Sequence, residues 1–346
     1  MYRHGIVRKE RFQEAEMKKL FALFACFMIF FGLSGCVDMP DDKKTIQVGV
    51  SIYKFDDNFM TLYREEIESY FKSLNTEEVE YEVTIADGKN DMAEQANQID
   101  NFITQDFDVL IINLVQSTSA STIIEKCEAA KKPCIFINRE PSADDMKKFE
   151  GMITYVGADA RQSGRMQGEI IAELDNKGDI NGDGILQYVM VVGDPENVDA
   201  KYRTQYSIEQ YTQATHNEVE KIDEQRGDWD QSKGQEIVAN ALTQYGDKIE
   251  VVFCNNDAMA LGAAQAITGA GRTVGKDIYL VGVDALSEAV DLVSEDKMTG
   301  TVLNDHVTQA RKAVDAAIKA VNGEKLDVYY WVDYVKVTPA NAKDFK

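Results

Sequence analysis

The sequence predicts an α/β fold with two doubly wound parallel-sheet lobes, and three observations carry that prediction. Short apolar runs alternate with amphipathic stretches of helical length along most of the chain, a pattern typical of βαβ units and parallel sheets. The alternation divides into two series of similar length. The chain has 346 residues, which suits about two domains of 100–200 residues each.

The first series begins directly after a short polar segment. Its strands are expected where β-branched and other apolar residues form runs of four to eight, and its helices where apolar residues recur every three or four positions. The expected strands are 46–53, 79–85, 109–113 and 134–138. Helices are expected at 59–74, at 91–104 and from Ser119 onward.

The second series repeats the same pattern. The expected strands are 153–156, 187–192, 218–223, 251–255 and 278–283, and the expected helices are 161–174, 200–212, 231–243, 258–267 and 287–294. In open α/β sheets a ligand binds outside the carboxyl ends of the strands. The residues that follow each strand are therefore the candidates for a binding site.

Polar side chains follow five of these strands, and a sixth polar segment lies at 303–305. They occur in segments 55–59, 138–140, 193–199, 255–257, 283–285 and 303–305, which supply carboxylates, amides and an arginine. Such groups suit a neutral polyhydroxylated ligand, because each hydroxyl both donates and accepts a hydrogen bond. Taken one at a time, Asp and Asn at strand ends are also ordinary loop or helix-cap residues.

The amino terminus predicts export. Met17 precedes two lysines, residues 20–33 are almost wholly apolar, and the segment ends in Leu-Ser-Gly-Cys36, which is typical of a secretory signal. Residues 1–35 are expected to be a signal peptide with a lipobox, with Met17 as the true start and Cys36 as the lipidated residue of a membrane-anchored protein. Residues 36–44 would be a tether. The alternative is an uncleaved membrane anchor.

Charge and cysteine content exclude several functions. The formal net charge is −22, which argues against a nucleic-acid partner because phosphates require basic patches. There is no CxxC motif, and Cys134 and Cys254 lie in apolar runs, as buried free cysteines do. A disulfide framework and a zinc site are therefore not expected.

One loop has the spacing of a calcium site. Oxygen side chains stand at its places one, three, five and nine, Gly184 stands at the turn, and Ile185 can offer its carbonyl. The side-chain ligands are Asp179, Asn181, Asp183 and Gln187. Place twelve, where an EF-hand carries a bidentate Glu, is Met190, so the last carboxylate must come from elsewhere. The alternative is a solvated Asp/Gly turn.

Four motifs resemble those of the galactose/glucose-binding proteins, which have the type I periplasmic-binding-protein fold. They are the segments 52–60, 256–260, 282–286 and 300–305 within a similarity that runs from 46 to about 345. The resemblance implies an amino-terminal lobe of 45–157 plus 304–333 and a carboxyl-terminal lobe of 158–303 plus 334–346, joined by a multi-strand hinge. It also implies Glu250 as the missing Ca²⁺ ligand.

The resemblance further implies a hexose site for D-galactose or D-glucose. Its polar contacts would be Asp57, Asn138, Arg139, Asn197, Asp199, Arg203, Asn256, Asp284 and Asn304, and its stacking aromatics Phe59 and Trp229. Two positions depart from the family pattern, which has Lys at Arg139 and His at Asn197. Without the resemblance, the sequence agrees equally well with Phe59 as a residue of the core and with Trp229 as part of a surface lid.

These features favour a non-enzymatic sugar receptor that delivers its ligand to an ABC transporter permease. A nicotinamide-dependent dehydrogenase would carry G-x-G-x-x-G after the first strand, where this chain has Asp56-Asp57-Asn58-Phe59. A sugar-regulated repressor would add a helix-turn-helix and a basic surface. A sensor lipoprotein that signals to a chemoreceptor or histidine kinase, and a different monosaccharide as the ligand, remain alternatives.

Overall fold

The computed structural model describes residues 43–346. Their contacts form two units. The described part of the small unit consists of residues 43–44 and 76–79, in which the amide of Lys44 donates to the Glu78 carbonyl at 2.8 Å. The main unit consists of residues 45–75 and 80–346. The predicted signal peptide and Cys36 lie outside the described residues.

The first sheet has six strands in the order β11-β5-β4-β3-β1-β2. Its strands are β1 (Lys44–Ile52), β2 (Val79–Asp87), β3 (Val109–Ile112), β4 (Cys134–Ile137), β5 (Ile153–Gly157) and β11 (Tyr329–Trp331). β1, β3, β4, β5 and β11 pair in parallel. The central strands β3 and β4 are buried along their whole length, as expected for a sheet that helices cover on both faces.

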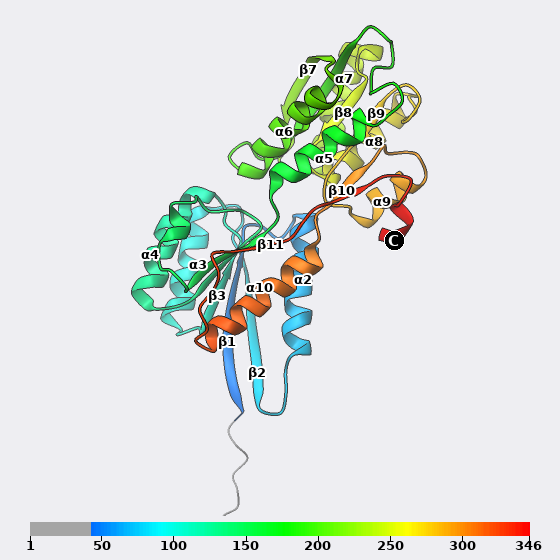
Figure 1. The fold of residues 1–346 in the computed structure, drawn as a ribbon. Coiled ribbons are helices and arrows are strands. Elements are labelled where there is room, and N and C mark those ends of the chain that lie inside the picture. Colours follow the sequence, from blue (N-terminus) through cyan, green and yellow to red (C-terminus); the bar gives the residue numbers. More distant parts are fainter. Residues whose placement is uncertain (1–42) are drawn as a thin grey trace, which may run out of the picture. The chain divides into compact units, whose positions relative to one another are not determined.

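Four helices pack on the first sheet: α2 (Asn58–Ser73), α3 (Met92–Thr104), α4 (Ala120–Ala130) and α10 (His306–Val321). Figure 1 shows α3 and α4 on one side of the sheet and α2 and α10 on the other. The core beneath α3 and α4 contains Phe102, Ile124 and Phe136. The two helices of the other face lie against each other, and α10 also contacts β3, β4 and β5.

The second sheet has four parallel strands in the order β7-β6-β8-β9. They are β6 (Ile185–Val192), β7 (Glu218–Arg226), β8 (Val251–Cys254) and β9 (Tyr279–Val281). A separate antiparallel pair consists of β10 (Thr301–Leu303) and β12 (Val335–Val337). Single bridges join Val281 to Gly300 and Asp284 to Leu303, so β10 continues from the edge of this sheet.

Alternate residues of β6 enter two different cores, which explains why this strand is apolar from Tyr188 to Val192. Val189 and Val191 face α7 (Gln231–Tyr245), α8 (Asp257–Gly269) and α9 (Ser287–Ser294). Tyr188 and Met190 face α5 (Ala160–Ala172) and α6 (Val198–Thr215). Successive side chains of a strand point to opposite faces, so helices on both faces require a continuous apolar run.

In each sheet the strand order reverses next to the strand that comes first in the chain, β1 in the first sheet and β6 in the second. The expected strand 153–156 of the second series is β5, which belongs to the first sheet. In the first sheet the reversal lies between β1 and β3, and in the second between β6 and β8. Ligands of doubly wound folds bind at this switch point, outside the carboxyl ends of the strands. The fold therefore directs attention to the residues after β1 and β3, to those after β4 beside β3, and to those after β6 and β8.

The predicted elements of both series are present, and their ends agree with the prediction to within three residues. The expected strand 278–283 is shorter, because the chain turns at Gly282, whose amide donates to the Gly300 carbonyl at 3.2 Å. The helix α10 and the strands β10, β11 and β12 were not predicted. The three strands are three residues each, too short to show a periodicity.

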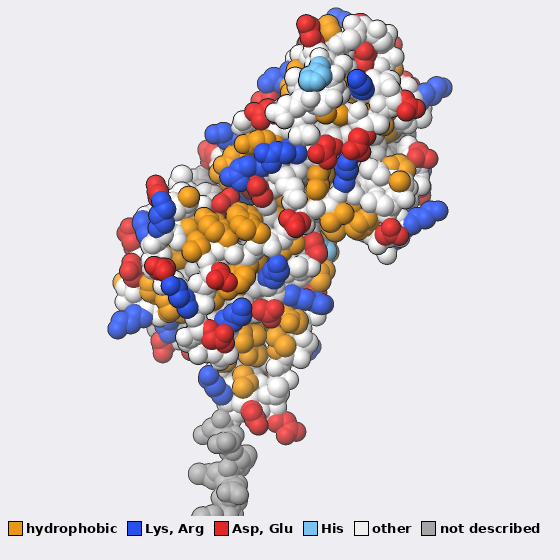
Figure 2. All heavy atoms as spheres, in the orientation of Figure 1, with side chains coloured by type: hydrophobic (Ala, Val, Ile, Leu, Met, Phe, Trp, Pro, Cys, Tyr) orange, Lys and Arg blue, Asp and Glu red, His pale blue; other side chains and the backbone are white. Residues whose placement is uncertain are grey.

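The described surface carries acidic and basic side chains interspersed on the face shown in Figure 2. Residues Cys127, Cys134 and Cys254 are free and buried. Within residues 43–346, no helix is long and apolar enough to cross a membrane.

Candidate functional site

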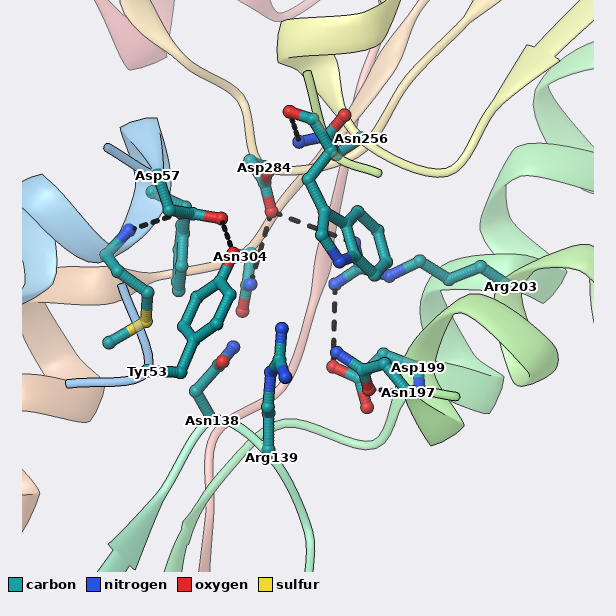
Figure 3. A pocket seen from close by; sticks show the side chains of 13 residues that line it. Tyr53, Asp57, Asn138, Arg139, Asn197, Asp199, Arg203, Asn256, Asp284 and Asn304 are labelled. Atoms are coloured by element: carbon teal, nitrogen blue, oxygen red, sulfur yellow. Dashed lines mark hydrogen bonds and ion pairs between the residues drawn. The ribbon is translucent and has the colours of Figure 1, made fainter. Parts of the chain in front are cut away.

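One cavity with about 340 Å³ of empty space gathers every residue predicted to contact a sugar. Figure 3 shows side chains from both sheets surrounding it. The lining residues are Tyr53, Asp57, Phe59, Met60, Asn138, Arg139, Asn197, Asp199, Arg203, Trp229, Asn256, Asp284 and Asn304.

Asp57 and Phe59 reach the cavity from the start of α2. The amide of Met60 donates to Asp57 Oδ1 at 2.8 Å, so Asp57 is the N-cap of this helix. The hydroxyl of Tyr53 donates to the other oxygen, Oδ2. Phe59 is buried and packs edge-to-face against Tyr63, with ring centroids 6.0 Å apart. Phe59 is therefore both a core residue and a wall of the cavity.

Asn138 and Arg139 follow β4. Asn138 has a left-handed backbone, with φ of 61°, which Asn tolerates better than most residues. Its side-chain oxygen accepts from Asn113 Nδ2 at 3.0 Å. The guanidinium of Arg139 lies 3.7 Å from the centre of the Tyr53 ring and donates to the Val115 carbonyl. These contacts hold a buried cation over an aromatic face.

Asn197, Asp199 and Arg203 all belong to the start of α6. Asn197 is its N-cap and accepts from the Asp199 amide at 2.9 Å. The guanidinium of Arg203 donates to the carbonyl of Asn255 at 2.8 Å and to the hydroxyl of Tyr334 at 3.2 Å. Residues 199 and 203 are one helical turn apart, so their side chains share one face of α6.

Trp229 and Asn256 form another side of the cavity. Trp229 is half-buried with φ of 66°, and its carbonyl accepts from Asn256 Nδ2 at 3.4 Å. The indole lies so close to Gly193 that a Cβ there would be 2.3 Å from a ring carbon. Asn256 is the N-cap of α8, because its side-chain oxygen accepts from the Met259 amide at 3.1 Å.

Asp284 and Asn304 lie side by side after β9 and β10. Asn304 Nδ2 donates to Asp284 Oδ1 at 3.3 Å, and Asn304 Oδ1 accepts from Gln309 Nε2 at 2.6 Å. Both cavity residues are buried. Their hydrogen bonds leave Asp284 Oδ2 as an acceptor for a ligand hydroxyl.

Two carboxylates flank one guanidinium in this site. Arg203 lies 3.9 Å from Asp199 and 4.0 Å from Asp284. Burial raises the pKa of both carboxyl groups, and Arg203 opposes that rise. Burial works to lower the pKa of Arg203, but the nearby Tyr334, Asp284 and Asp199 outweigh it, so its pKa is raised. The guanidinium thus remains charged and holds the two acids in place.

Three buried donors in the cavity have no hydrogen-bond partner: Arg139 Nε, Arg203 Nε and Trp229 Nε1. Buried donors without a partner are costly in folded proteins. Residues that line the cavity therefore carry both unpartnered donors and carboxylate or amide acceptors. A ligand with several hydroxyl groups would satisfy both kinds of group, since each hydroxyl donates and accepts.

The predicted calcium ligands also lie together. Glu250 accepts from the amides of Ile180 and Asn181 through Oε1, at 2.6 and 3.0 Å, and from the Gln187 amide through Oε2 at 3.0 Å. The side chain of Gln187 bonds Asn181 at 3.1 Å and Asp183 at 3.2 Å. Asp179 accepts from two glycine amides of the loop. Ile185, whose carbonyl is the last predicted ligand, begins β6.

Whether these residues suit Ca²⁺ depends on the donor set. Among residues 43–346, no group of three or more His, Cys, Asp and Glu side chains is arranged to hold a metal ion. The loop and Glu250 carry three carboxylates, among amide and carbonyl oxygens, that are not gathered around one point. Each carboxylate oxygen that accepts a backbone hydrogen keeps a further lone pair, and oxygen-only ligands are those that Ca²⁺ prefers. The donor chemistry fits.

The sequence missed four residues of the site. Tyr53 and Met60 line the cavity directly, and Tyr334 and Gln309 hold Arg203 and Asn304 in place. Tyr53 and Met60 lie within the motif 52–60, and Gln309 is five positions from Asn304, so a local signal for these three was present. Tyr334 is 131 positions from Arg203, and no local signal could have revealed it.

Comparison with known proteins gives a consistent result. A family model described as a periplasmic binding protein domain matches residues 48–325. The chain is 34% identical over 343 residues to the D-galactose/methyl-galactoside binding periplasmic protein MglB of Haemophilus influenzae, covering 95% of this chain and 99% of that protein. It is 26% identical over 318 residues to the ribose import binding protein RbsB of Bacillus subtilis, covering 90% and 95%.

A solved structure agrees in fold. The ABC transporter solute binding protein of Bacillus halodurans with bound myo-inositol superposes with a TM-score of 0.76 at 29% identity, over 88% of this chain and 98% of that one. The family match covers most of the chain, and the predicted architecture of two parallel-sheet lobes is confirmed. The chain belongs to the periplasmic binding protein family of the sugar-binding type.

Proposed function

We propose that this protein is the extracytoplasmic substrate-binding component of an ABC transporter for D-galactose or D-glucose and that it has no catalytic turnover. The observation that carries the proposal is the set of three unpartnered donors in one small cavity with buried carboxylates. Ligand hydroxyls would supply the missing acceptors. The similarity to a galactoside-binding relative over nearly its whole length supports a hexose.

The aromatic residues favour a pyranose ring. Phe59 and Trp229 line the cavity, and an aromatic face covers the apolar C–H patch of a sugar. Arg203 can direct its free Nε to a ring or hydroxyl oxygen while Asp199 and Asp284 accept from neighbouring hydroxyls. Each ligand hydroxyl left without a partner would cost about 1–3 kcal/mol, and that cost selects among sugars.

Transport requires that the ligand reach a membrane permease. In the proposal, residues from the two sheets close around the sugar by hinge motion, and the permease recognises the closed form. Lipidation at Cys36 would hold the protein at the outer face of the membrane. Delivery of the signal to a chemoreceptor or sensor kinase is the alternative use of the same closure. Co-purification with either membrane partner in the presence of ligand would distinguish these two uses.

A ligand panel tests the central claim. The melting temperature and the binding heat are measured with D-galactose, D-glucose, D-ribose, D-xylose and myo-inositol. One of the two hexoses should bind best and stabilise the protein by about 2.7 kcal/mol at a hundredfold excess over Kd. Asp284→Ala should abolish that shift while the unliganded protein stays folded. Binding of ribose, xylose or myo-inositol without either hexose would overturn the assignment.

We also propose that the loop of residues 179–187, together with Glu250, binds a structural Ca²⁺. The oxygen-only donor set and the contact of Glu250 with this loop support it. A chelator should lower the melting temperature and leave sugar affinity within a few-fold, because none of these residues lines the sugar cavity.

A variant separates metal binding from the loop's own hydrogen bonds. Glu250→Gln should weaken the loop with or without metal, since the carboxylate accepts backbone hydrogens as well. The decisive measurement is therefore its response to chelator and to added Ca²⁺, which should be absent. A wild-type melting curve that chelation leaves unmoved would refute the calcium site.

A further inference from the structure

Asp257 is a buried acid that does not line the sugar cavity. It is the first residue of α8, directly after Asn256, and it is fully buried. Its Oδ1 accepts from the Thr301 hydroxyl at 2.6 Å, and its Oδ2 accepts from the Leu286 amide at 2.9 Å. One carboxylate thus joins three segments that are distant in sequence: the start of α8, the loop after β9, and β10.

Each of these three segments carries a residue of the cavity. Asn256 precedes Asp257, Asp284 lies in the loop that contains Leu286, and Asn304 follows β10, the strand of Thr301. The backbone strengthens the connection, because the Asp257 amide donates to the Val283 carbonyl at 2.7 Å. Asp284 in turn pairs with β10 through its amide, which donates to the Val302 carbonyl at 2.8 Å.

The loop held by Asp257 needs such support. Asp284 and Ala285 have φ values of 123° and 53°, a conformation that non-glycine residues adopt rarely and at a cost in free energy. Strained backbone persists only where the surrounding structure holds it. The carboxylate also excludes any side chain from position 282, because a Cβ on Gly282 would lie 2.2 Å from Asp257 Oδ1.

The charge on Asp257 is poorly compensated. Burial raises its pKa to about 6, while the hydrogen bonds from Thr301 and Leu286 and the charge of Arg203 oppose the rise. The other titratable groups that feel it are Asp284 and Cys254, whose pKa values it raises. The ionised form accepts both of its hydrogen bonds, so it is the form that holds the loop and β10 together.

We propose that Asp257 is a positioning residue for the ligand site: through Thr301 and Leu286 it fixes the relative placement of Asn256, Asp284 and Asn304. It touches no ligand atom, yet ligand affinity depends on it. The inference rests on the proposed function only in requiring that the cavity bind a polyol, and it does not depend on which sugar is bound.

Two variants test it without touching a cavity residue. Asp257→Asn keeps the size of the side chain but replaces one acceptor with a donor. Thr301→Val keeps the shape of the β10 residue and removes its hydroxyl. With whichever panel sugar the wild type binds best, Asp257→Asn should weaken affinity by about tenfold and Thr301→Val by about three- to tenfold, the effect of one buried hydrogen bond. The double variant should bind the sugar no more weakly than the single variant of lower affinity, because both changes break the same hydrogen bond between residues 257 and 301.

Tyr211→Phe is the matched control. It removes a hydroxyl that donates to the Lys177 carbonyl at 2.8 Å in the same half of the chain, away from the cavity. This variant should lower the melting temperature and leave affinity unchanged. If Asp257→Asn and Thr301→Val behave like Tyr211→Phe, the carboxylate only stabilises the fold and the proposal is wrong.

Two further readouts separate positioning from general stability. Between pH 7.5 and pH 5 the wild type should lose more affinity than Asp257→Asn, because Asp199 and Asp284 are present in both proteins and only the wild type can protonate residue 257. Hydrogen exchange needs no ligand: both variants should speed exchange in segments 283–286 and 301–304, and Tyr211→Phe should not. Unchanged exchange in those segments would overturn the inference even if no sugar of the panel bound.

Discussion

Arg203 is the residue whose removal should reveal the electrostatics of the site most clearly. Its guanidinium lies 3.9 Å from the carboxylate of Asp199 and 4.0 Å from that of Asp284, and both carboxylates are buried. At an effective dielectric constant of about 20, each attraction at that distance is about 4 kcal/mol before desolvation is subtracted. Replacing Arg203 with Met keeps most of the side-chain volume and leaves both carboxylates without a cation.

Breaking a buried pair by removing one partner costs about 3–5 kcal/mol. At pH 7.5 we therefore expect Arg203→Met to lose about 3 kcal/mol of unfolding free energy, or about 6–12 °C in melting temperature. The loss has a definite pH dependence. Without Arg203 the folded-state pKa of Asp199 and of Asp284 rises further above the unfolded value of about 3.9. Groups with a raised carboxyl pKa favour the folded state at low pH and disfavour it as pH rises through that range.

The destabilisation of Arg203→Met relative to the wild type should thus shrink as the pH is lowered from 7.5 to 5. Urea unfolding at both pH values measures it. Arg311→Met is the control, because Arg311 pairs with Glu66 at a shorter distance, 2.6 Å, but half of its side chain is exposed, and exposed pairs contribute about 0–1 kcal/mol. An equal loss for Arg203→Met at both pH values would refute the charge-based explanation.

Two other substitutions address ligand choice. Asn197→His, which restores the family residue, should change the glucose-to-galactose affinity ratio by about 1 kcal/mol, the scale of one neutral hydrogen bond. It should also lower the melting temperature, because His cannot replace the cap bond to Asp199. An unchanged ratio in a calorimetric titration would mean that position 197 does not contact the ligand. Gly193→Ala should displace the Trp229 ring, whose carbon would lie 2.3 Å from the new methyl group, and should weaken sugar binding about tenfold. Gly269→Ala, where the added methyl meets nothing within 4 Å, is its control, and equal affinities of these two variants would show that the indole position does not matter.

The sequence predicted the alternation of elements and the polar positions at the strand ends well, because both depend on local patterns. Parallel strands buried on two faces appear as apolar runs, and the residue after such a run is at the carboxyl edge of a sheet. The helix α10 was missed although Asp305, its N-cap, precedes an amphipathic stretch. That signal was present and could have been used.

The partners of the site residues could not be predicted in the same way. The family resemblance implies Asn138, Arg203 and Asp284 as residues of the cavity, but what holds them comes from other parts of the chain. Tyr155 donates to the Asn138 carbonyl, and Tyr334 accepts from Arg203. Such contacts arise from tertiary packing and have no spacing rule. For the same reason the sequence shows Asp257 only as part of the motif 256–260, and its hydrogen bond with Thr301 of β10 is evident only in the structure.

Asp57, Asn197 and Asn256 each begin a helix and also line the cavity. The alternative interpretation of these residues as helix caps was therefore correct, and it does not exclude a ligand role. Replacing such a cap by Ala costs about 0.5–2 kcal/mol, so a mutation that changes recognition there also changes folding. Arg139 and Asn304 cap no helix. Substitution at those two positions removes no helix cap but breaks the buried hydrogen bonds of Arg139 with Val115 and of Asn304 with Asp284 and Gln309. A change of ligand therefore has a cost in stability at all five positions, and the three caps should vary mainly among Asp, Asn, Ser and Thr.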